Sequence, residues 1–146
     1  MLISQHVAGL RPSIDRQKAI IARINDLTPV MDVLTKELYA IEEDLFNSEG
    51  SSGRHGKWDD ITEETRRKRR DKKDGPILDD TGALRASLTH PNALGSRRVI
   101  SRNGLQIGSA LPYADKQKQR RPIDFTLSQV NYMNLQVQRY VMGEIL

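Results

Sequence analysis

The chain of 146 residues carries a net charge of +4, 37% hydrophobic residues and a mean hydropathy of −0.59. Its length fits one domain over residues 1–146 with a modest core. The lack of cysteine excludes a disulfide scaffold and thiolate metal sites, and no apolar run reaches the roughly 18 residues that a membrane span needs. Seven aromatic residues are few for a self-sufficient core, so we expect either extended helices or partner subunits that complete part of the burial.

The N-terminal segment, residues 1–12, has no clear periodicity, and we expect an irregular arm there. It also lacks the basic region and long apolar stretch of a signal peptide. Ser13 is a candidate N-cap for a helix that places Ile14, Ile21 and Ile24 near one face.

The clearest pattern predicts an amphipathic helix over residues 29–47. Thr28 is its candidate N-cap, and Pro29 suits the first helical position. The apolar stripe recurs at steps of three and four residues and consists of Val30, Leu34, Leu38, Ile41 and Leu45. The acids expected off this stripe are Glu37, Glu42, Glu43 and Asp44.

Residues 47–57, which contain three glycines and three serines, predict a flexible loop. Their order does not fit a phosphate-binding loop, which needs a lysine and a hydroxyl residue after its last glycine. Trp58 follows alone in a polar setting.

A basic helix is predicted over residues 61–73, because Asp60 and Glu63 have the spacing of a capping box. We expect Gly75-Pro76 to end it. Its basic residues are Arg66, Arg67, Lys68, Arg69, Arg70, Lys72 and Lys73. A second basic cluster contains Lys116, Lys118, Arg120 and Arg121. Two interpretations stay open: a face that meets solvent or an acidic partner, and contact with nucleic-acid phosphates without base stacking, since no aromatic residue is interleaved.

A short helix is predicted after the basic run. Ile77 and Leu78 pin the chain to the core, Gly82 lies in the first turn, and Leu84 and Leu88 seat the helix. The candidate caps are Asp79, Asp80 and Thr81.

Asn103-Gly104 between 97–101 and 105–109 is a strong hairpin signal, and its expected buried face consists of Val99, Leu105 and Ile107. Residues 111–119 predict a short helix, and 121–125 an extended segment or edge strand. A capping box of Thr126 and Gln129 opens a last helix. Its expected apolar face is Val130, Met133 or Asn134, Val137 and Val141. The resulting fold class is α+β: long N-terminal helices, a small antiparallel sheet, short helices and a C-terminal helix.

The sequence offers no recognisable catalytic or metal-binding constellation, so we expect no enzymatic activity and no cofactor. The histidines, which fall in predicted loops without ligand spacing, are His6, His55 and His90. A hydrolytic enzyme using Asp79, Asp80 and His90 is the remaining enzymatic alternative.

The order of motifs resembles the virion morphogenesis, or tail completion, family of Mu-like and related tailed phages. The resemblance covers residues 30–142 and rests on order and spacing rather than on any one motif. The matching residues are Phe46, Gly50, Trp58, Thr62, Thr65, Lys68, Ile77, Leu78, Thr81, Gly82, Leu84, Ser87, Ile107, Gly108, Ser109, Tyr113, Ala114, Arg121 and Pro122. Residues 115–126 depart from the family pattern.

This resemblance implies a non-enzymatic virion protein at the head–tail junction, made in the host cytoplasm. It would form a homo-oligomeric ring, expected to be a hexamer, between the connector or portal side and the tail tube or tail terminator. No membrane contact is expected, and the basic clusters would face packaged DNA or acidic subunits. The residues expected to have structural roles are Trp58, Ile77, Leu78, Asp80, Thr81, Gly82, Leu84, Leu88, Tyr113 and Pro122. The alternative is a small DNA-binding protein that uses the helix at 61–73.

Overall fold

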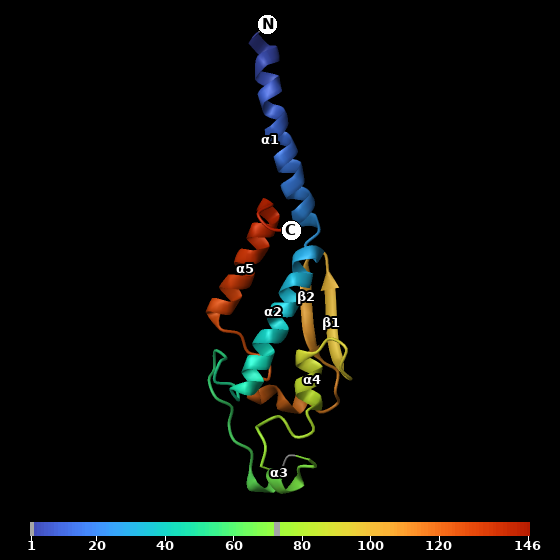
Figure 1. Ribbon diagram of the computed structural model, residues 1–146, viewed down its shortest axis with the longest axis vertical. Helices are drawn as coiled ribbons and strands as arrows, with labels where there is room; N and C mark the ends of the chain where they lie inside the picture. Colours follow the sequence, from blue (N-terminus) through green and yellow to red (C-terminus); the bar gives the residue numbers. More distant parts are fainter. Residues whose placement is uncertain (1, 72–73) are drawn as a thin grey trace.

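The computed structural model describes residues 2–71 and 74–146, with side chains from Leu10 onward. In chain order the elements are α1 (Leu2–Asn25), α2 (Thr28–Asn47), α3 (Glu63–Lys68), α4 (Ala83–Thr89), β1 (Ser96–Ser101), β2 (Gly104–Ser109), the 3-10 helix η1 (Ala114–Arg120) and α5 (Leu127–Met142). This confirms the α+β class with a C-terminal helix. The molecule is elongated, with α1 projecting from one end and α3 lying at the other (Figure 1).

The prediction of an irregular segment over residues 1–12 is wrong for the residues that the structure describes, because α1 is already helical at Leu2. The helix continues through Pro12, so Ser13 is an interior residue rather than an N-cap. A proline inside a helix removes one backbone hydrogen bond, but this position is exposed, where water can satisfy the freed carbonyl.

The joint between α1 and α2 is held by two other elements. The Leu27 backbone N–H donates to the Arg102 carbonyl oxygen in the hairpin turn at 2.9 Å, and the Tyr140 hydroxyl of α5 donates to the Asp26 carbonyl oxygen at 3.0 Å. The Asp26 carboxylate accepts from the Thr28 N–H at 3.1 Å, and the pKa of this carboxyl is lowered mainly by its hydrogen bonds to Thr28. The base of α1 therefore has a fixed direction.

Helix α2 matches its predicted bounds to within one residue, and every residue of its predicted apolar stripe is buried. Leu27, rather than Thr28, takes the capping position, and Pro29 lies in the first turn. The prediction that Glu42 lies off the buried stripe is wrong, since this residue is 0% exposed. It lies four residues after Leu38, on the buried side of the helix.

The predicted hairpin is confirmed: β1 and β2 pair antiparallel across Arg102-Asn103, with Ile100 opposite Leu105. These two side chains pack toward α2, and Ile107 is half-buried. The prediction that Val99 is a core residue is wrong, because Val99 pairs with Gln106 on the opposite face of the hairpin and is 48% exposed. A period-two pattern with apolar residues at consecutive positions leaves the choice of face open.

Two hydrophobic clusters lie along α2. The cluster nearer α3 contains Leu45, Phe46, Trp58, Ile61, Ile77, Leu84 and Leu88. The cluster nearer α1 contains Val30, Met31, Leu34 and Tyr140, with Met133, Val137 and Val141 of α5 packed against it. The cluster nearer α3 thus buries four residues that were expected to have structural roles: Trp58, Ile77, Leu84 and Leu88.

The segment between the hairpin and α5 is only partly as expected. The short helix predicted over 111–119 is the 3-10 helix η1, which begins at Ala114. Residues 121–125 form no strand; Arg121 is left-handed (φ +48°), and Pro122 is half-buried. The capping box of Thr126 and Gln129 is confirmed, with both reciprocal hydrogen bonds present.

Candidate functional site

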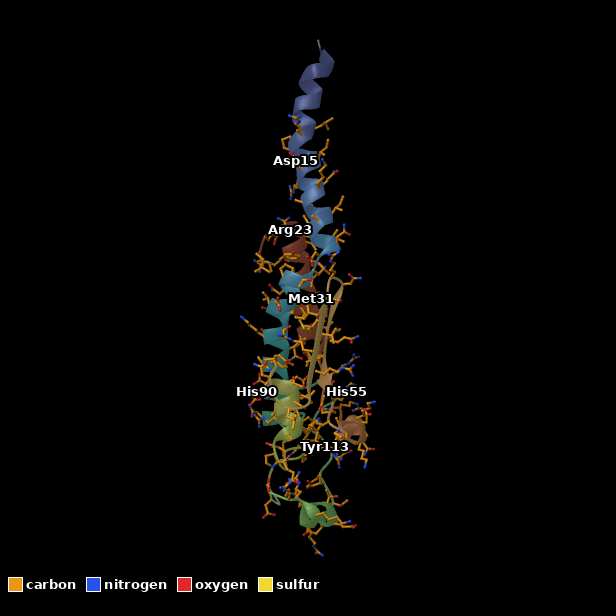
Figure 2. The ribbon with its side chains drawn as sticks, turned by 90° about the vertical axis from the view of Figure 1, so that its right-hand side faces the viewer. Asp15, Arg23, Met31, His55, His90 and Tyr113 are labelled. Carbon is orange, nitrogen blue, oxygen red and sulfur yellow. The ribbon has the colours of Figure 1, made fainter. Side chains whose placement is uncertain are left out.

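Residues from both predicted basic clusters meet at an open hollow of about 430 Å³ near α3. Lys68, Arg69 and Arg70 come from the first cluster and Arg120 from the second. The apolar residues of its lining are Ile61, Leu78, Ala83, Leu84 and Tyr113. We call this site the basic hollow. In Figure 2, Tyr113 lies between the body and the end of the molecule that carries α3.

Helix α3 is shorter than the predicted helix over 61–73, since it ends at Lys68. Thr62 rather than Asp60 is the N-cap; its side chain accepts from the Thr65 N–H at 3.2 Å. Lys72 and Lys73 lie outside the described residues. Gly75-Pro76 therefore does not end this helix.

Several bases of α3 are paired with acids of the same segment. Arg66 contacts Asp60 at 2.6 Å, and the pKa of Asp60 is lowered, first by its hydrogen bond from the Ile61 N–H and then by Arg66. The remaining pairs are Arg67 with Glu63 at 3.6 Å and Lys68 with Glu64 at 2.5 Å. These pairs reduce the positive field that the run would present to a polyanion.

Arg69 is a buried structural residue, which corrects its prediction as a surface contact. It is 8% exposed, and its guanidinium donates to the Gly75 carbonyl oxygen at 2.9 Å and the Pro76 carbonyl oxygen at 2.8 Å. A planar fork suits two adjacent acceptors, which a lysine in the same place would not satisfy. Arg69 thus holds the turn that leads to Ile77.

Asp80 does not cap the following helix. Its carboxylate accepts from the backbone N–H groups of Arg70 at 3.0 Å and Asp71 at 3.1 Å. Gly82 takes the capping position of α4 in a left-handed conformation (φ +80°), and Thr81 accepts from the Ala83 N–H at 3.3 Å. Asp80 therefore fixes one wall of the basic hollow.

The second basic cluster reaches the hollow through Arg120 alone. Lys116, Lys118 and Arg121 are exposed and do not line it. Lys118 pairs with Asp115 at 2.8 Å, and the Arg121 carbonyl oxygen accepts from the Trp58 indole N–H at 3.3 Å.

Two buried acids, Glu42 and Asp124, lie outside the hollow. The one signal for them in the sequence is the i, i+4 spacing from Leu38 to Glu42. Burial, and secondarily the charge of Asp124, raises the pKa of Glu42 to about 8. Asp124 is 8% exposed and accepts from the His55 backbone N–H and ring Nδ1, each at 2.9 Å. It thereby ties the 47–57 loop, which forms successive turns, to the segment before α5. The flexibility expected of that loop stays a prediction.

The histidines do not form a site. His55 bonds Asp124, His90 contacts the Thr89 hydroxyl at 2.7 Å, and the two lie on opposite sides of the body in Figure 2. Position 6 falls within α1 rather than in a loop. Among the described residues no three acids or histidines are grouped to bind a metal ion. Of the helices in residues 2–71 and 74–146, none has the length and apolar content that crossing a bilayer requires.

Comparison with protein families, with curated proteins and with solved structures finds no match to this chain. The hollow combines apolar and basic side chains. An apolar floor edged by Lys68, Arg70 and Arg120 is suited to a protein segment that brings both an apolar side chain and a carboxylate.

Proposed function

We propose that this protein is a structural virion component at the head–tail junction of a tailed phage, where it forms a ring between connector and tail proteins. The observation that carries the proposal is the mutual contact of the residues on which the family resemblance rests. They are distributed along the chain from Phe46 to Pro122, yet several of them meet in one cluster and around one hollow.

Three residues of this pattern, Phe46, Gly50 and Trp58, pack closely together. Phe46 and Trp58 pack edge to face with ring centroids 5.2 Å apart. A Cβ at Gly50 would lie 2.6 Å from the Trp58 ring, so only glycine fits there. These contacts give a physical reason for an aromatic residue, a glycine and a tryptophan at this spacing in the chain.

The later motifs also meet. The Ser87 hydroxyl, which is 1% exposed, donates to the Leu84 carbonyl oxygen at 2.7 Å and bonds the Ser109 hydroxyl at 2.8 Å. Ser109 ends β2, so this bond joins α4 to the hairpin. The motif around Gly82 and the motif around Ser109 thus support one another across the core.

The basic hollow supplies the proposed contact with a neighbouring virion protein. Its floor favours a protein ligand over the outer face of duplex DNA, because the phosphate backbone has no apolar group to bury against Leu78 or Tyr113. We propose an acidic segment of the connector or tail-side partner as its ligand.

The test is complementation of particle assembly in a phage that lacks the gene, followed by negative-stain imaging. We expect unjoined capsids and tails without the protein, and joined particles when the wild-type chain is supplied. A chain with K68E, R70E and R120E in the hollow should not restore joining. The matched control R67E, K116E and K118E carries the same charge change outside the hollow and should restore it. Joined particles in the absence of the protein would refute the junction role.

A second candidate is a small DNA-binding protein, and the observation that favours it is the meeting of two basic clusters at one hollow. Titration of duplex DNA at several salt concentrations distinguishes the two functions. A regulator retains sequence preference and loses affinity in the hollow variant. A virion protein binds without sequence preference, or not at all.

A further inference from the structure

Helix α1 exposes an apolar stripe that nothing else in the described chain covers. Leu10, Ile14, Ile21 and Ile24 follow one another at steps of four, seven and three residues, and each is 45 to 56% exposed. The sequence continues the same spacing backwards at Val7 and Ile3. Such a three–four repeat is the pattern of a helix that packs along another helix.

The partly buried residues at the base of α1 belong to a different face. Ala19, Ile20 and Arg23 are half-buried, and the Arg23 side chain lies close to Gly143 after α5. Contact with the rest of its own chain therefore leaves the apolar stripe free.

The edge of this stripe is basic. Arg11 and Lys18 are exposed and lie three and four residues from Ile14, so both border the stripe on the same side. They are seven residues apart, which is about 10.5 Å along a helix axis. We call Leu10–Asn25, with its stripe and this edge, the arm.

A groove between α2 and α5 has complementary chemistry. It encloses about 220 Å³ and is lined by Glu37, Ile41, Ser128, Gln129 and Tyr132. Next to it, the outer face of α2 exposes residues at steps of four, three and four, namely Val33, Glu37, Ala40 and Asp44. The exposed apolar residues beside it include Val33, Tyr132 and Leu135.

The acids of this face match the bases of the arm in spacing. Glu37 and Asp44 are seven residues apart, as are Arg11 and Lys18. Two helices packed side by side can therefore form both ion pairs while the isoleucines of the arm enter the groove.

The arm cannot reach the groove of its own chain. Figure 1 shows α1 extending beyond the end of α5, away from the middle of α2. The hydrogen bonds of Leu27 and Tyr140 hold its base in that direction. Pairing of two arms with each other is disfavoured, because their exposed charges Arg11, Arg16 and Lys18 outnumber Asp15. The occupant that remains is the arm of a second copy.

We propose that the arm of one subunit docks in the α2–α5 groove of another copy of this chain. The inference deepens the self-association that the proposed function includes, and it specifies which surfaces meet. The hydrogen bonds at the base of the arm direct the stripe away from its own groove, and docking on a second copy would protect the exposed helix of Leu10–Lys18.

Single-cysteine cross-linking tests the contact directly, because the natural chain has no cysteine. A chain with Gln17→Cys on the arm is mixed with a chain carrying Ser128→Cys, at an exposed position in the groove, and the pair is oxidised. We expect a covalent species of twice the chain mass. The control replaces S128C by R98C on β1, outside the groove. Equal cross-linking of both mixtures, or none of the first, overturns the proposal.

Charge exchange tests the chemistry in solution, with mass measured by light scattering across a concentration series. R11E with K18E, or E37K with D44K, should weaken self-association about tenfold or more. Combining all four should restore it. The matched control R16E with D32K reverses exposed charges on the same helices away from the stripe and should have no effect. A wild-type monomer at all concentrations, or no rescue by the combined variant, overturns the proposal.

The particle assay separates this inference from the proposed function. If the arm variants stay monomeric and still join heads to tails, the arm contact is not the one used in the virion. If the arm variants lose the self-association that the wild-type chain shows, and the gene is dispensable for joining, the junction function fails and the arm contact remains.

Discussion

Gly50 lies where any side chain would collide with the Trp58 ring and with the Gly56 carbonyl oxygen, 2.9 Å from an added Cβ. Its φ of +91° adds a second constraint. Two other glycines separate the collision from the backbone strain. An added Cβ at Gly56 would meet no atom, but its φ is +80°, and an added Cβ at Gly104 would meet no atom on a backbone that is not left-handed.

We therefore expect Gly→Ala to destabilise the protein least at Gly104, more at Gly56 and most at Gly50. The left-handed strain is worth about 1 kcal/mol, and the collision at Gly50 adds roughly 1–3 kcal/mol. Denaturant unfolding of the three variants measures the order. A Gly50→Ala variant as stable as Gly104→Ala would show that the loop rearranges freely around Trp58.

Glu42 makes stability depend on pH. Its two carboxyl oxygens are buried without a hydrogen-bond partner among the described residues, and its pKa rises from 4.5 to about 8 on folding. Between these values the unfolded chain has released the proton while the folded chain retains it. The free energy of unfolding therefore falls as pH rises from about 4.5 to about 8, and this contribution is lost above that.

Glu42→Gln cannot ionise, so the variant should lack this fall, which we expect to be roughly 2–4 kcal/mol. Urea unfolding at intervals from pH 5 to pH 9 measures the two profiles. Glu63→Gln, at an exposed position, is the control and should follow the wild-type profile. Parallel profiles for wild type and Glu42→Gln would contradict the assignment.

At the scale of elements, the basic run divides into structural and surface residues. Arg69→Ala leaves the Gly75 and Pro76 carbonyl oxygens without their donors, so we expect a loss of about 1–3 kcal/mol in the free energy of unfolding. Arg67→Ala, an identical substitution at an exposed position two residues earlier, should cost within about 0.5 kcal/mol. Chemical denaturation compares them. Equal losses would mean that Arg69 does not hold the turn.

Elements with local signals were predictable. The stripe of α2, the Thr126–Gln129 capping box and the hairpin are each encoded within a few residues, and each is confirmed, although the turn residues are Arg102-Asn103 and Gly104 already belongs to β2. Contacts between distant parts of the chain left no such signal. Nothing near Asp124 indicates that it binds a residue 69 positions earlier.

The basic hollow was predictable only in part. The sequence identified both basic clusters, but which members meet depends on how η1 and α3 pack, and only Arg120 of the second cluster reaches the site. The structural role of Arg69 could not be distinguished from the roles of the other bases in the run. Its acceptors are backbone carbonyl groups, which every residue has, so no side-chain type marks them in the sequence. Pro12 led to the wrong prediction for the N-terminal segment, which is part of helix α1. The free-energy cost of a proline inside a helix depends on its exposure, which the local sequence does not specify.

At the scale of the whole molecule, stability should differ sharply between α1 and α2. Every residue from Leu10 to Lys18 is exposed, and an isolated helix of this length is marginal in water. We expect the amides of this stretch to exchange fast in dilute protein, while those of α2 from Val30 to Phe46 exchange slowly. Hydrogen exchange resolved by mass spectrometry measures both. Comparable protection of the two helices in the monomer would contradict this picture.

Among the described residues, helix α2 alone contributes buried residues to both hydrophobic clusters, Val30 and Leu34 to one and Leu45 and Phe46 to the other. Its 20 residues form a rod about 30 Å long with the arm at one end and the basic hollow near the other. A force that pulls on the arm would therefore be transmitted along helix α2 as tension and torque. Along this rod Glu42 lies between the two clusters, toward the C-terminal end of α2, and its carboxyl oxygens have no hydrogen-bond partner among the described residues, so no side-chain hydrogen bond of this residue secures α2 against such a force.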